Sequence, residues 1–398
     1  TADIIINEDV KGDASGLYAW TPVGAGTSTT TRYTGSFDGQ GHTISGLYVS
    51  ASKYVGMFGY AGEGSKISNL TISNSVIKAS GNNAGAIAGD AYIIENCHVT
   101  ESVEVTGVSH VGSVVGSVET AISKSSNAGT VTATGNNVGG VVGRVQSNGS
   151  TAMTECYNVG SVSGASLVGG LAGNLYNGGT ISDCYNTGSV IATAASGMSG
   201  GIVGNFRSGT IKNVYTNVRP TANTAGSVAG KLEWAAGQKT LTQVYVPTGD
   251  LETVGDLQGC KIQNGQAEAK PENELKALAP TLGEKFASDA KSINDGYPIL
   301  AWQTGSAETD PDQPEIDLNG WNGTTAKVPD KAEGVYQISS AEELKWFADT
   351  AKKTPEIKGV LTTDIDLNHQ PWTPIAAFTG ELDGQNHTIQ NLYCKTNG

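Results

Sequence analysis

The sequence predicts an all-β protein, a right-handed parallel β-helix with about 28 residues in each turn. A short apolar motif framed by glycines, such as VGGVVG, recurs seven times and ends at Gly59, Gly89, Gly116, Gly143, Gly173, Gly204 and Gly230. A second string begins with isoleucine and usually has apolar residues at its fourth and sixth positions; it starts at Ile44, Ile67, Ile94, Ile122, Met153, Ile181, Ile211 and Leu241. Repetition at this period is typical of solenoids, because one unit cannot bury its apolar face alone.

Each turn is predicted to contain three short strands. Valine, isoleucine, threonine and tyrosine dominate the apolar pieces, and glycine, asparagine and serine interrupt them at intervals too short for helices. The glycine-framed motif and the isoleucine string supply two strands, and pieces such as 131–133 and 162–163 supply the third. No window of the repeat has the apolar spacing of an amphipathic helix.

Stacking these turns would align equivalent side chains in columns about 4.8 Å apart. The fourth position of the string is expected to face inward, and it holds Leu47, Leu70, Cys97, Ser125, Cys156, Cys184, Val214 and Val244. Because side chains alternate along a strand, the fifth position is expected to face outward; it holds Tyr48, Thr71, His98, Ser126, Tyr157, Tyr185, Tyr215 and Tyr245. One position further, Asn127, Asn158 and Asn186 are expected to form an amide ladder.

The two ends of the chain repeat one another. FDGQGHTI near the N-terminus returns as LDGQNHTI near the C-terminus, and each is preceded by a W-T-P string. Residues 1–303 are therefore predicted to form one module, and 321–398 the opening segment of a second. A capping box at Ser340 and Glu343 predicts a helix over about 340–352, which we expect to cover the open end of its own solenoid. Residue Thr1 is expected to lie inside a module, because the first module lacks this helix.

The repeat fades after Val246. A helix is predicted at 272–278, between Pro271 and Pro280, and the segment 251–303 is interpreted as a C-terminal cap. Residues 304–320 are acidic and contain two prolines, as expected of a linker between modules.

Composition restricts the classes of partner. The net charge of −14 argues against nucleic acid and anionic membrane surfaces, and charged residues make up only 16% of the chain. Neither an apolar stretch long enough to span a membrane nor a signal peptide is recognisable. Five cysteines without a CxxC pair indicate neither a disulfide framework nor a zinc site, so Cys97, Cys156 and Cys184 are expected to be buried thiols. We therefore expect no metal and no cofactor.

The strongest enzymatic hypothesis concerns the third position of the string. There Glu155 and Asp183 lie on adjacent turns, near the carboxylate spacing of retaining glycosidases, with Lys124 one turn earlier. The alternative is a solvated polar face, which we favour because the turns between the strands are too short to build a cleft.

A ligand-binding hypothesis concerns the tyrosine column. Tyr157, Tyr185, Tyr215 and Tyr245 would stack on sugars or on an apolar peptide if the four rings are exposed. The alternative is that the rings stack on one another and stiffen the coil. Asp38-Gly39 and Asp383-Gly384 are interpreted as tight turns rather than calcium loops.

The glycine-framed motifs ending at Gly143, Gly173 and Gly204, the Tyr-Asn-x-Gly-Ser-Val strings, the DGQ segments and NDGYPILAW resemble the GLUG repeat family of large bacterial surface proteins. That family includes non-catalytic parts of IgA-cleaving peptidases, and the zinc motif HExxH of such peptidases is absent here. The resemblance implies an extracellular, non-enzymatic adhesin or rigid spacer whose partner is a host or cell-wall glycan or protein, besides neighbouring modules of a longer polypeptide. The alternative is a polysaccharide hydrolase or lyase that uses Glu155 and Asp183.

Overall fold

The structure is a computed structural model that describes residues 2–12, 14–25, 31–146, 152–234, 237–304, 321, 325–367, 371–372, 374–375, 377–390 and 392–394. The chain forms two compact units, Thr1–Ser306 and Ala307–Gly398. The predicted linker at 304–320 lies outside the described residues except for Thr304.

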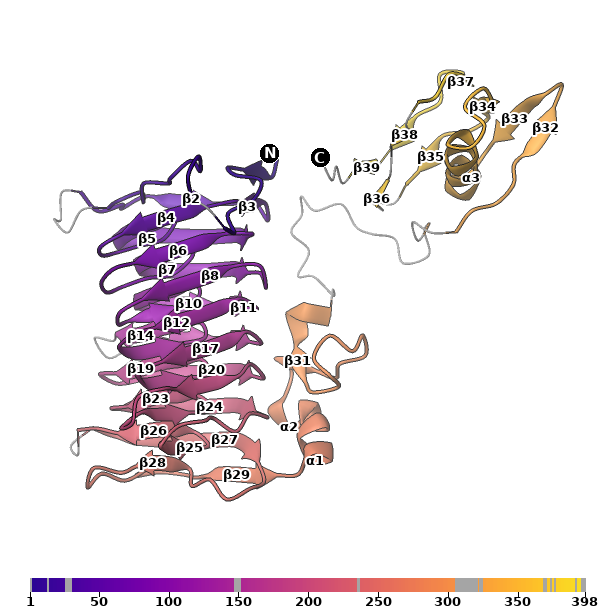
Figure 1. The fold of residues 1–398 in the computed structure, drawn as a ribbon. Helices are drawn as coiled ribbons and strands as arrows, with labels where there is room; N and C mark the ends of the chain where they lie inside the picture. The colour runs from indigo at the N-terminus through magenta and orange to yellow at the C-terminus, as the bar shows by residue number, and fades with distance from the viewer. Residues whose placement is uncertain are drawn as a thin grey trace. The chain divides into compact units, whose positions relative to one another are not determined.

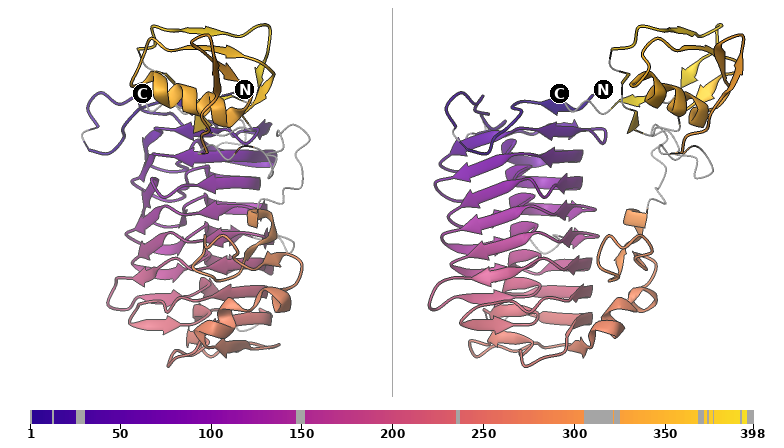
Figure 2. Two further views of the ribbon diagram at one scale, coloured as in Figure 1. Left: turned by 90° about the vertical axis from the view of Figure 1, so that its right-hand side faces the viewer. Right: turned by 45° about the vertical axis from the view of Figure 1, so that its right-hand side comes forward.

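The first unit is a parallel β-helix, as predicted (Figure 1). Its turns lie one above another, and every strand pair within the stack is parallel. Figure 2 shows the same stack from two further sides. Sheet A contains β1 (Ile4–Ile5), β2 (Ser36–Asp38), β3 (Thr43–Ser45), β5 (Phe58–Ser73), β7 (Ala88–Val99), β10 (Val115–Ser123), β11 (Ser126–Asn127), β14 (Val142–Gln146), β15 (Ala152–Thr154), β16 (Tyr157–Asn158), β19 (Ala172–Tyr176), β20 (Gly179–Asn186), β23 (Val203–Phe206), β24 (Gly209–Thr216), β26 (Ala229–Leu232), β27 (Lys239–Pro247), β28 (Val254–Asp256) and β29 (Ala267–Lys270).

Two further sheets complete each turn. Sheet B contains β4 (Tyr48–Ala51), β6 (Val76–Ala79), β8 (Glu104–Gly107), β12 (Thr130–Ala133), β17 (Ser161–Gly164) and β21 (Val190–Ala192). Sheet C contains β9 (Val111–Gly112), β13 (Asn136–Gly139), β18 (Ser166–Gly169), β22 (Met198–Gly200) and β25 (Thr224–Gly226). The predicted third strand is therefore sheet B, and the glycine-framed motif is the reversal from sheet C into sheet A.

The glycines of this motif are needed for close approach. A Cβ on Gly139 would lie 2.1 Å from the carbonyl oxygen of Val142, three residues further along the reversal. A Cβ on Gly173 would lie 2.2 Å from the carbonyl carbon of Asn137, in the preceding turn. Both distances are far below van der Waals contact, so only glycine fits without moving backbone.

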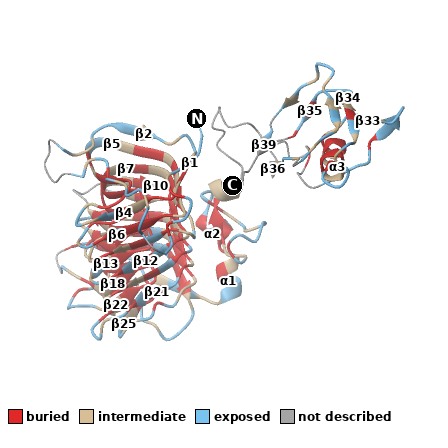
Figure 3. Cartoon of the chain, turned by 45° about the horizontal axis from the view of Figure 1, so that its top comes forward, coloured by how far each residue is buried: buried red, intermediate tan, exposed pale blue. Residues whose placement is uncertain are grey.

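The predicted inward column is confirmed, because all its members are buried and all except Ser125 belong to one continuous hydrophobic core. Figure 3 shows buried segments in successive turns of the stack. Leu70 pairs with Cys97, and Cys184 pairs with Val214. The amide ladder is also confirmed: the Asn127 side chain donates to Asn158 at 2.7 Å, and that of Asn158 donates to Asn186 at 2.8 Å.

The interpretation of 251–303 as a cap implied that this segment covers the end of the stack. Residues 271–304 lie along its side instead (Figure 1). β28 and β29 add strands to sheet A, and the chain then turns back along the side of the β-helix (Figure 1). We call residues 271–304 the strap. It contains α1 (Glu272–Lys276), α2 (Ala279–Leu282), β30 (Phe286–Ala287), β31 (Ile299–Leu300), which pairs antiparallel with β30, and a 3-10 helix at Ala301–Thr304.

The second unit starts another parallel stack. It contains β32 (Asp330–Ala332), β33 (Val335–Ile338), α3 (Ala341–Ala351), β34 (Lys358–Leu361), β35 (Ile365–Asp366), β36 (Pro371–Trp372), β37 (Glu381–Asp383), β38 (Ile389–Gln390) and β39 (Tyr393–Cys394), and β33–β34–β37, β35–β38 and β36–β39 pair in parallel. The predicted helix is α3, and Ser340 caps it by accepting from the Glu343 amide at 3.3 Å. The Glu343 carboxylate accepts from Ser339 instead of completing the capping box on Ser340. The apolar face of α3 packs in the core of this unit through Leu344 and Phe347.

Residues 364–388 of the second unit repeat the polar contacts of residues 3–43 in the first unit. Asp3 accepts from the Thr43 amide at 2.8 Å, and Asp364 accepts from the Thr388 amide at 2.9 Å. The equivalent histidines, His42 and His387, face these aspartates at 3.4 and 3.2 Å. Shared sequence strings therefore build the same local structure twice.

Candidate functional site

The column that contains Glu155 and Asp183 is a corner of the coil in left-handed backbone conformation. Every member has a positive φ, between 47° and 74°: Gly46, Asn69, Asn96, Lys124, Glu155, Asp183, Asn213 and Gln243. Asparagine, aspartate and glycine tolerate this conformation best. Backbone geometry therefore explains the polar residues of this column without catalysis, which sequence reasoning had not recognised.

The two carboxylates have structural partners. The Glu155 carboxylate lies 3.1 Å from the Lys285 ammonium, and its backbone carbonyl accepts from the Trp302 indole at 3.3 Å. Its hydrogen bond and charge raise the pKa of Lys285. Asp183 accepts from the Asn213 side chain at 3.0 Å. Lys124 is partly buried on the turn before Glu155, and its amide donates to the Thr154 carbonyl at 3.1 Å.

Two hollows in the described part of the chain lie elsewhere. One of about 190 Å³ is lined by the start of the strap and by Tyr245, and one of about 450 Å³ is lined by 252–258 and Ile262. Neither includes Glu155 or Asp183. Neither of these two hollows therefore brings a sugar chain to the two carboxylates.

The tyrosine column points away from the β-helix core, as predicted, but the strap covers it. Tyr185, Tyr215 and Tyr245 are 1%, 0% and 5% exposed, and Tyr157 is partly buried. The hypothesis that requires exposed rings therefore does not fit Tyr185, Tyr215 and Tyr245. Sequence periodicity missed this because the strap is not part of the repeat.

The rings stack on one another beneath the strap. The centroids of Tyr157 and Tyr185 are 5.0 Å apart with an interplanar angle of 4°, and those of Tyr185 and Tyr215 are 5.3 Å apart at 9°. Leucines 275, 278, 282 and 300 and Phe286 of the strap pack against the column. The alternative interpretation, a self-stacked column, therefore describes the geometry.

Polar groups of the strap satisfy the hydroxyls of the tyrosines. The Gln303 amide donates to the Tyr185 hydroxyl at 3.0 Å, and the Asn294 amide donates to the Tyr215 hydroxyl at 2.8 Å. Burial raises the pKa of both phenols well above the usual value. Trp302 extends the contact to Tyr157 and to His98, at 5.7 and 5.4 Å between ring centroids. Burial lowers the pKa of His98 to about 4, so this imidazole is neutral at physiological pH.

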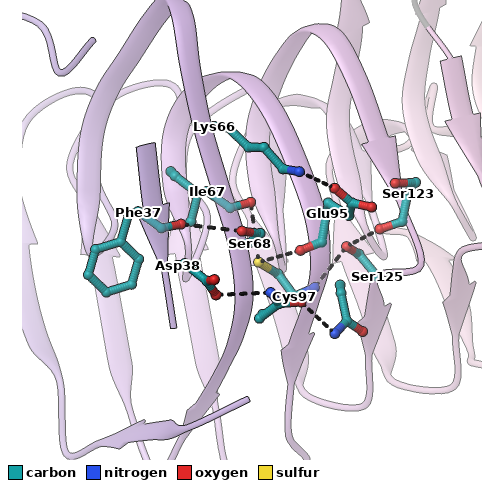
Figure 4. A network of polar contacts seen from close by, with 11 residues as sticks. Phe37, Asp38, Lys66, Ile67, Ser68, Glu95, Cys97, Ser123 and Ser125 are labelled. Atoms are coloured by element: carbon teal, nitrogen blue, oxygen red, sulfur yellow. Dashed lines mark hydrogen bonds and ion pairs between the residues drawn. The ribbon is translucent and has the colours of Figure 1, made fainter. Parts of the chain in front are cut away.

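The buried thiols are integrated into the backbone network, as Figure 4 shows for Cys97. Its sulfur donates to the carbonyl of Glu95 at 3.4 Å, and its amide donates to the Ser125 hydroxyl at 3.1 Å. Burial raises the pKa of Cys97 to about 12, which makes the thiol inert. Cys156, Cys184 and Cys260 are also free and buried.

Among the described residues, no cluster of three or more His, Cys, Asp or Glu side chains could hold a metal ion. None of the helices in these ranges is long and apolar enough to cross a bilayer.

A buried acid away from the strap was not anticipated. Asp90 is 6% exposed, its Oδ1 has no hydrogen-bond partner, and its Oδ2 accepts from Asn83 at 3.2 Å. Burial and the nearby Glu119 carboxylate raise the pKa of Asp90 to about 8. Glu119 itself accepts from the Tyr60 hydroxyl at 3.1 Å.

An exposed aromatic group was also missed. Trp234 is 47% exposed and has a φ of 64°, which is unusual for a bulky residue. Arg207 lies between rings, with its guanidinium carbon 4.4 Å from the Tyr176 centroid and 5.6 Å from that of Trp234. The available signal was that Trp234 is the single tryptophan between Ile44 and Val246.

Comparison with known proteins identifies one motif and two similar proteins. Residues 164–191 match the model of the GLUG motif. A segment of 122 residues, 30% of this chain, is 33% identical to halomucin of Haloquadratum walsbyi and spans 1% of that protein. The crystal structure of a candidate immunoglobulin A1 protease from Bacteroides ovatus aligns with a TM-score of 0.47 at 19% identity, covering 76% of this chain and 84% of that chain.

Proposed function

We propose that this chain, which carries the GLUG motif, is a non-enzymatic part of an extracellular or cell-surface protein and acts as an adhesin or rigid spacer. The observation that carries the proposal is the ion pair between Glu155 and Lys285. Glu155 is the best catalytic candidate, but it lies at a corner of the backbone with positive φ and holds the strap, which is a structural role. The resemblance to the GLUG family and the likeness to a protein named as a mucin support a surface location.

The architecture supports a spacer because it is stiff along one axis. Each turn pairs with the next through backbone hydrogen bonds, and the asparagine ladder and the stacked tyrosines run in the same direction. Solenoids of this kind present long surfaces for contact with other molecules. The few charges leave that surface polar through serine, threonine and asparagine, which suits contact with glycans.

The second candidate function is the polysaccharide hydrolase or lyase predicted for Glu155 and Asp183. Their position on adjacent turns still favours this candidate, since the Glu155 amide donates to the Ser182 carbonyl, next to Asp183. The ion pair of Glu155 with Lys285 opposes it, and neither of the two hollows described above includes either carboxylate.

Surface labelling tests the location and the role together. Antibodies against the purified chain are expected to label intact cells of the source organism, and purified chain is expected to bind immobilised glycans or host proteins. Labelling only after permeabilisation would contradict the surface proposal. Binding without any release of sugar separates the adhesin from the hydrolase.

A further inference from the structure

The outer edge of the β-helix carries a three-residue platform composed of Tyr176, Arg207 and Trp234. Tyr176 ends β19, Arg207 follows β23, and Trp234 lies in the connection between β26 and β27, so three successive turns contribute. The Arg207 guanidinium contacts both rings. These cation–π contacts keep the guanidinium flat against the aromatic groups.

A buried lysine, Lys239, supports this platform through hydrogen bonds to the backbone. The Lys239 side chain is 0% exposed, and its ammonium group donates to the carbonyl oxygens of Trp234 at 3.0 Å and Gly237 at 2.9 Å. Burial lowers the pKa of this ammonium group. Burying an ammonium group is costly unless hydrogen bonds compensate for the lost hydration. Here they fix the turn that presents Trp234 in its left-handed conformation.

Further contacts involve Trp234 and the residue before it. The Asn205 amide donates to the Glu233 carboxylate at 2.7 Å, directly before Trp234. A Cβ on Gly237 would lie 2.8 Å from the Trp234 ring, so the indole packs on this glycine. The indole is therefore half exposed and in contact with Gly237 and Arg207.

Among the described residues, no ion pair joins the Arg207 guanidinium to an acid. The guanidinium lies over the two rings, and its Nε is buried there without a hydrogen-bond partner. Elsewhere on the chain, exposed lysines such as Lys66 and Lys358 do pair with glutamates. An unpaired guanidinium beside an exposed indole matches a ligand that has both a carboxylate and a flat apolar face.

We propose that Trp234 and Arg207 bind the carboxylated sugar units of an acidic glycan. The pyranose ring stacks on the exposed face of Trp234, and the sugar carboxylate accepts hydrogen bonds from Arg207. Tyr176 backs the guanidinium and orients it. This inference deepens the proposed adhesin function and rests on it.

Binding to matched pairs of sugars tests the proposal. The probes are sialyllactose against lactose, and oligogalacturonate against the same oligosaccharide with its carboxyl groups reduced. The intact chain is expected to bind at least one of the two carboxylated sugars. Its affinity for that sugar should be about tenfold or more higher than for the neutral counterpart, because removal of a central Trp or Arg contact typically costs that much affinity. Retention of neither carboxylated probe would overturn the proposal.

Variants locate the site. Trp234→Ala and Arg207→Lys are each expected to lose about tenfold or more in affinity, and Trp234→Phe to recover part of it. The matched control is Tyr18→Ala, because Tyr18 is another exposed aromatic residue, at 76% exposure. Thermal unfolding of each variant separates loss of binding from loss of fold. Full affinity in Trp234→Ala would place the site elsewhere, while surface labelling of cells would leave the adhesin proposal standing.

Discussion

The Glu155 carboxylate of the β-helix lies 3.1 Å from the Lys285 ammonium of the strap. This ion pair joins the residue of the less favoured catalytic hypothesis to a segment interpreted as an end cap. Glu155→Gln removes the charge from a pair whose lysine is about half exposed, so we expect a loss of less than about 1 kcal/mol in the free energy of unfolding. Urea unfolding of the variant and wild type measures it, and a loss of several kcal/mol would show that the pair has a larger role.

The strap is expected to open locally while the β-helix stays folded. Trp302→Ala removes the ring contacts to Tyr157 and His98, and hydrogen exchange of amides in 286–304 is expected to become faster. Exchange in β7 and β20 should stay at the wild-type rate. Ile293→Ala, at a residue of the strap that is 53% exposed, is the control. Equal acceleration in the strands of the stack would mean that strap and coil unfold together.

The asparagine ladder is expected to contribute measurably to the free energy of unfolding. Asn158→Ala leaves the Asn127 amide and the Gly160 backbone without their side-chain partners inside the core, so the free energy of unfolding is expected to fall by about 2–3 kcal/mol. Chemical denaturation followed by circular dichroism gives the value. Asn82→Ala, at an exposed position, provides the comparison and is expected to change it by less than about 0.5 kcal/mol. Equal values for both variants would show that the ladder does not stabilise the fold.

Substitution of different glycines by alanine is expected to destabilise the protein to different extents, depending on how closely other backbone approaches each glycine. Gly173→Ala places a Cβ 2.2 Å from the Asn137 carbonyl carbon, so backbone must move and the loss is expected to be about 3 kcal/mol or more. At Gly384 no atom lies within 4 Å of the added Cβ, and Gly384→Ala is expected to be nearly neutral. Thermal unfolding checks both, and an unaffected Gly173→Ala would contradict the packing argument.

Asp90 predicts a specific pH dependence. Its pKa in the folded chain is about 8, above the usual value of 3.8, so the folded state keeps a proton that the unfolded state releases. Stability from this group is therefore fully present below about pH 4, falls as the pH rises towards 8, and is level above that. Asp90→Asn removes this contribution, so its advantage over wild type should grow by several kcal/mol between pH 4 and pH 8. A constant difference across that range would contradict the raised pKa.

Periodicity made the stacked parts of this fold predictable. The inward thiols, the asparagine ladder and the outward tyrosines each depend on contacts between equivalent residues of neighbouring turns, which a repeat displays directly. The helix at 341–351 was predictable because capping and apolar spacing are local signals. The helix predicted at 272–278 is present as α1 (Glu272–Lys276), and Pro280 lies in the first turn of a second short helix, α2.

Features that depend on non-repeating segments were not predictable. The strap reaches Tyr185 and Glu155 from positions with no fixed spacing to them, so no sequence pattern links Lys285 to Glu155. The positive φ at Glu155 was partly visible in the Asn, Asp and Gly residues of its column, but Lys124 and Glu155 concealed it. The burial of Asp90 arises from chain packing in three dimensions, which a single polar position does not reveal.

Release of reducing ends from polysaccharides tests the central claim most directly, because the account assigns Glu155 and Asp183 to structure alone. Wild-type chain, Glu155→Gln and Asp183→Asn would be incubated with acidic and neutral polysaccharides, and the new reducing ends measured. The account predicts no release above the buffer level for all three. Release by the wild type that disappears in Asp183→Asn would contradict it and establish a polysaccharide-cleaving enzyme.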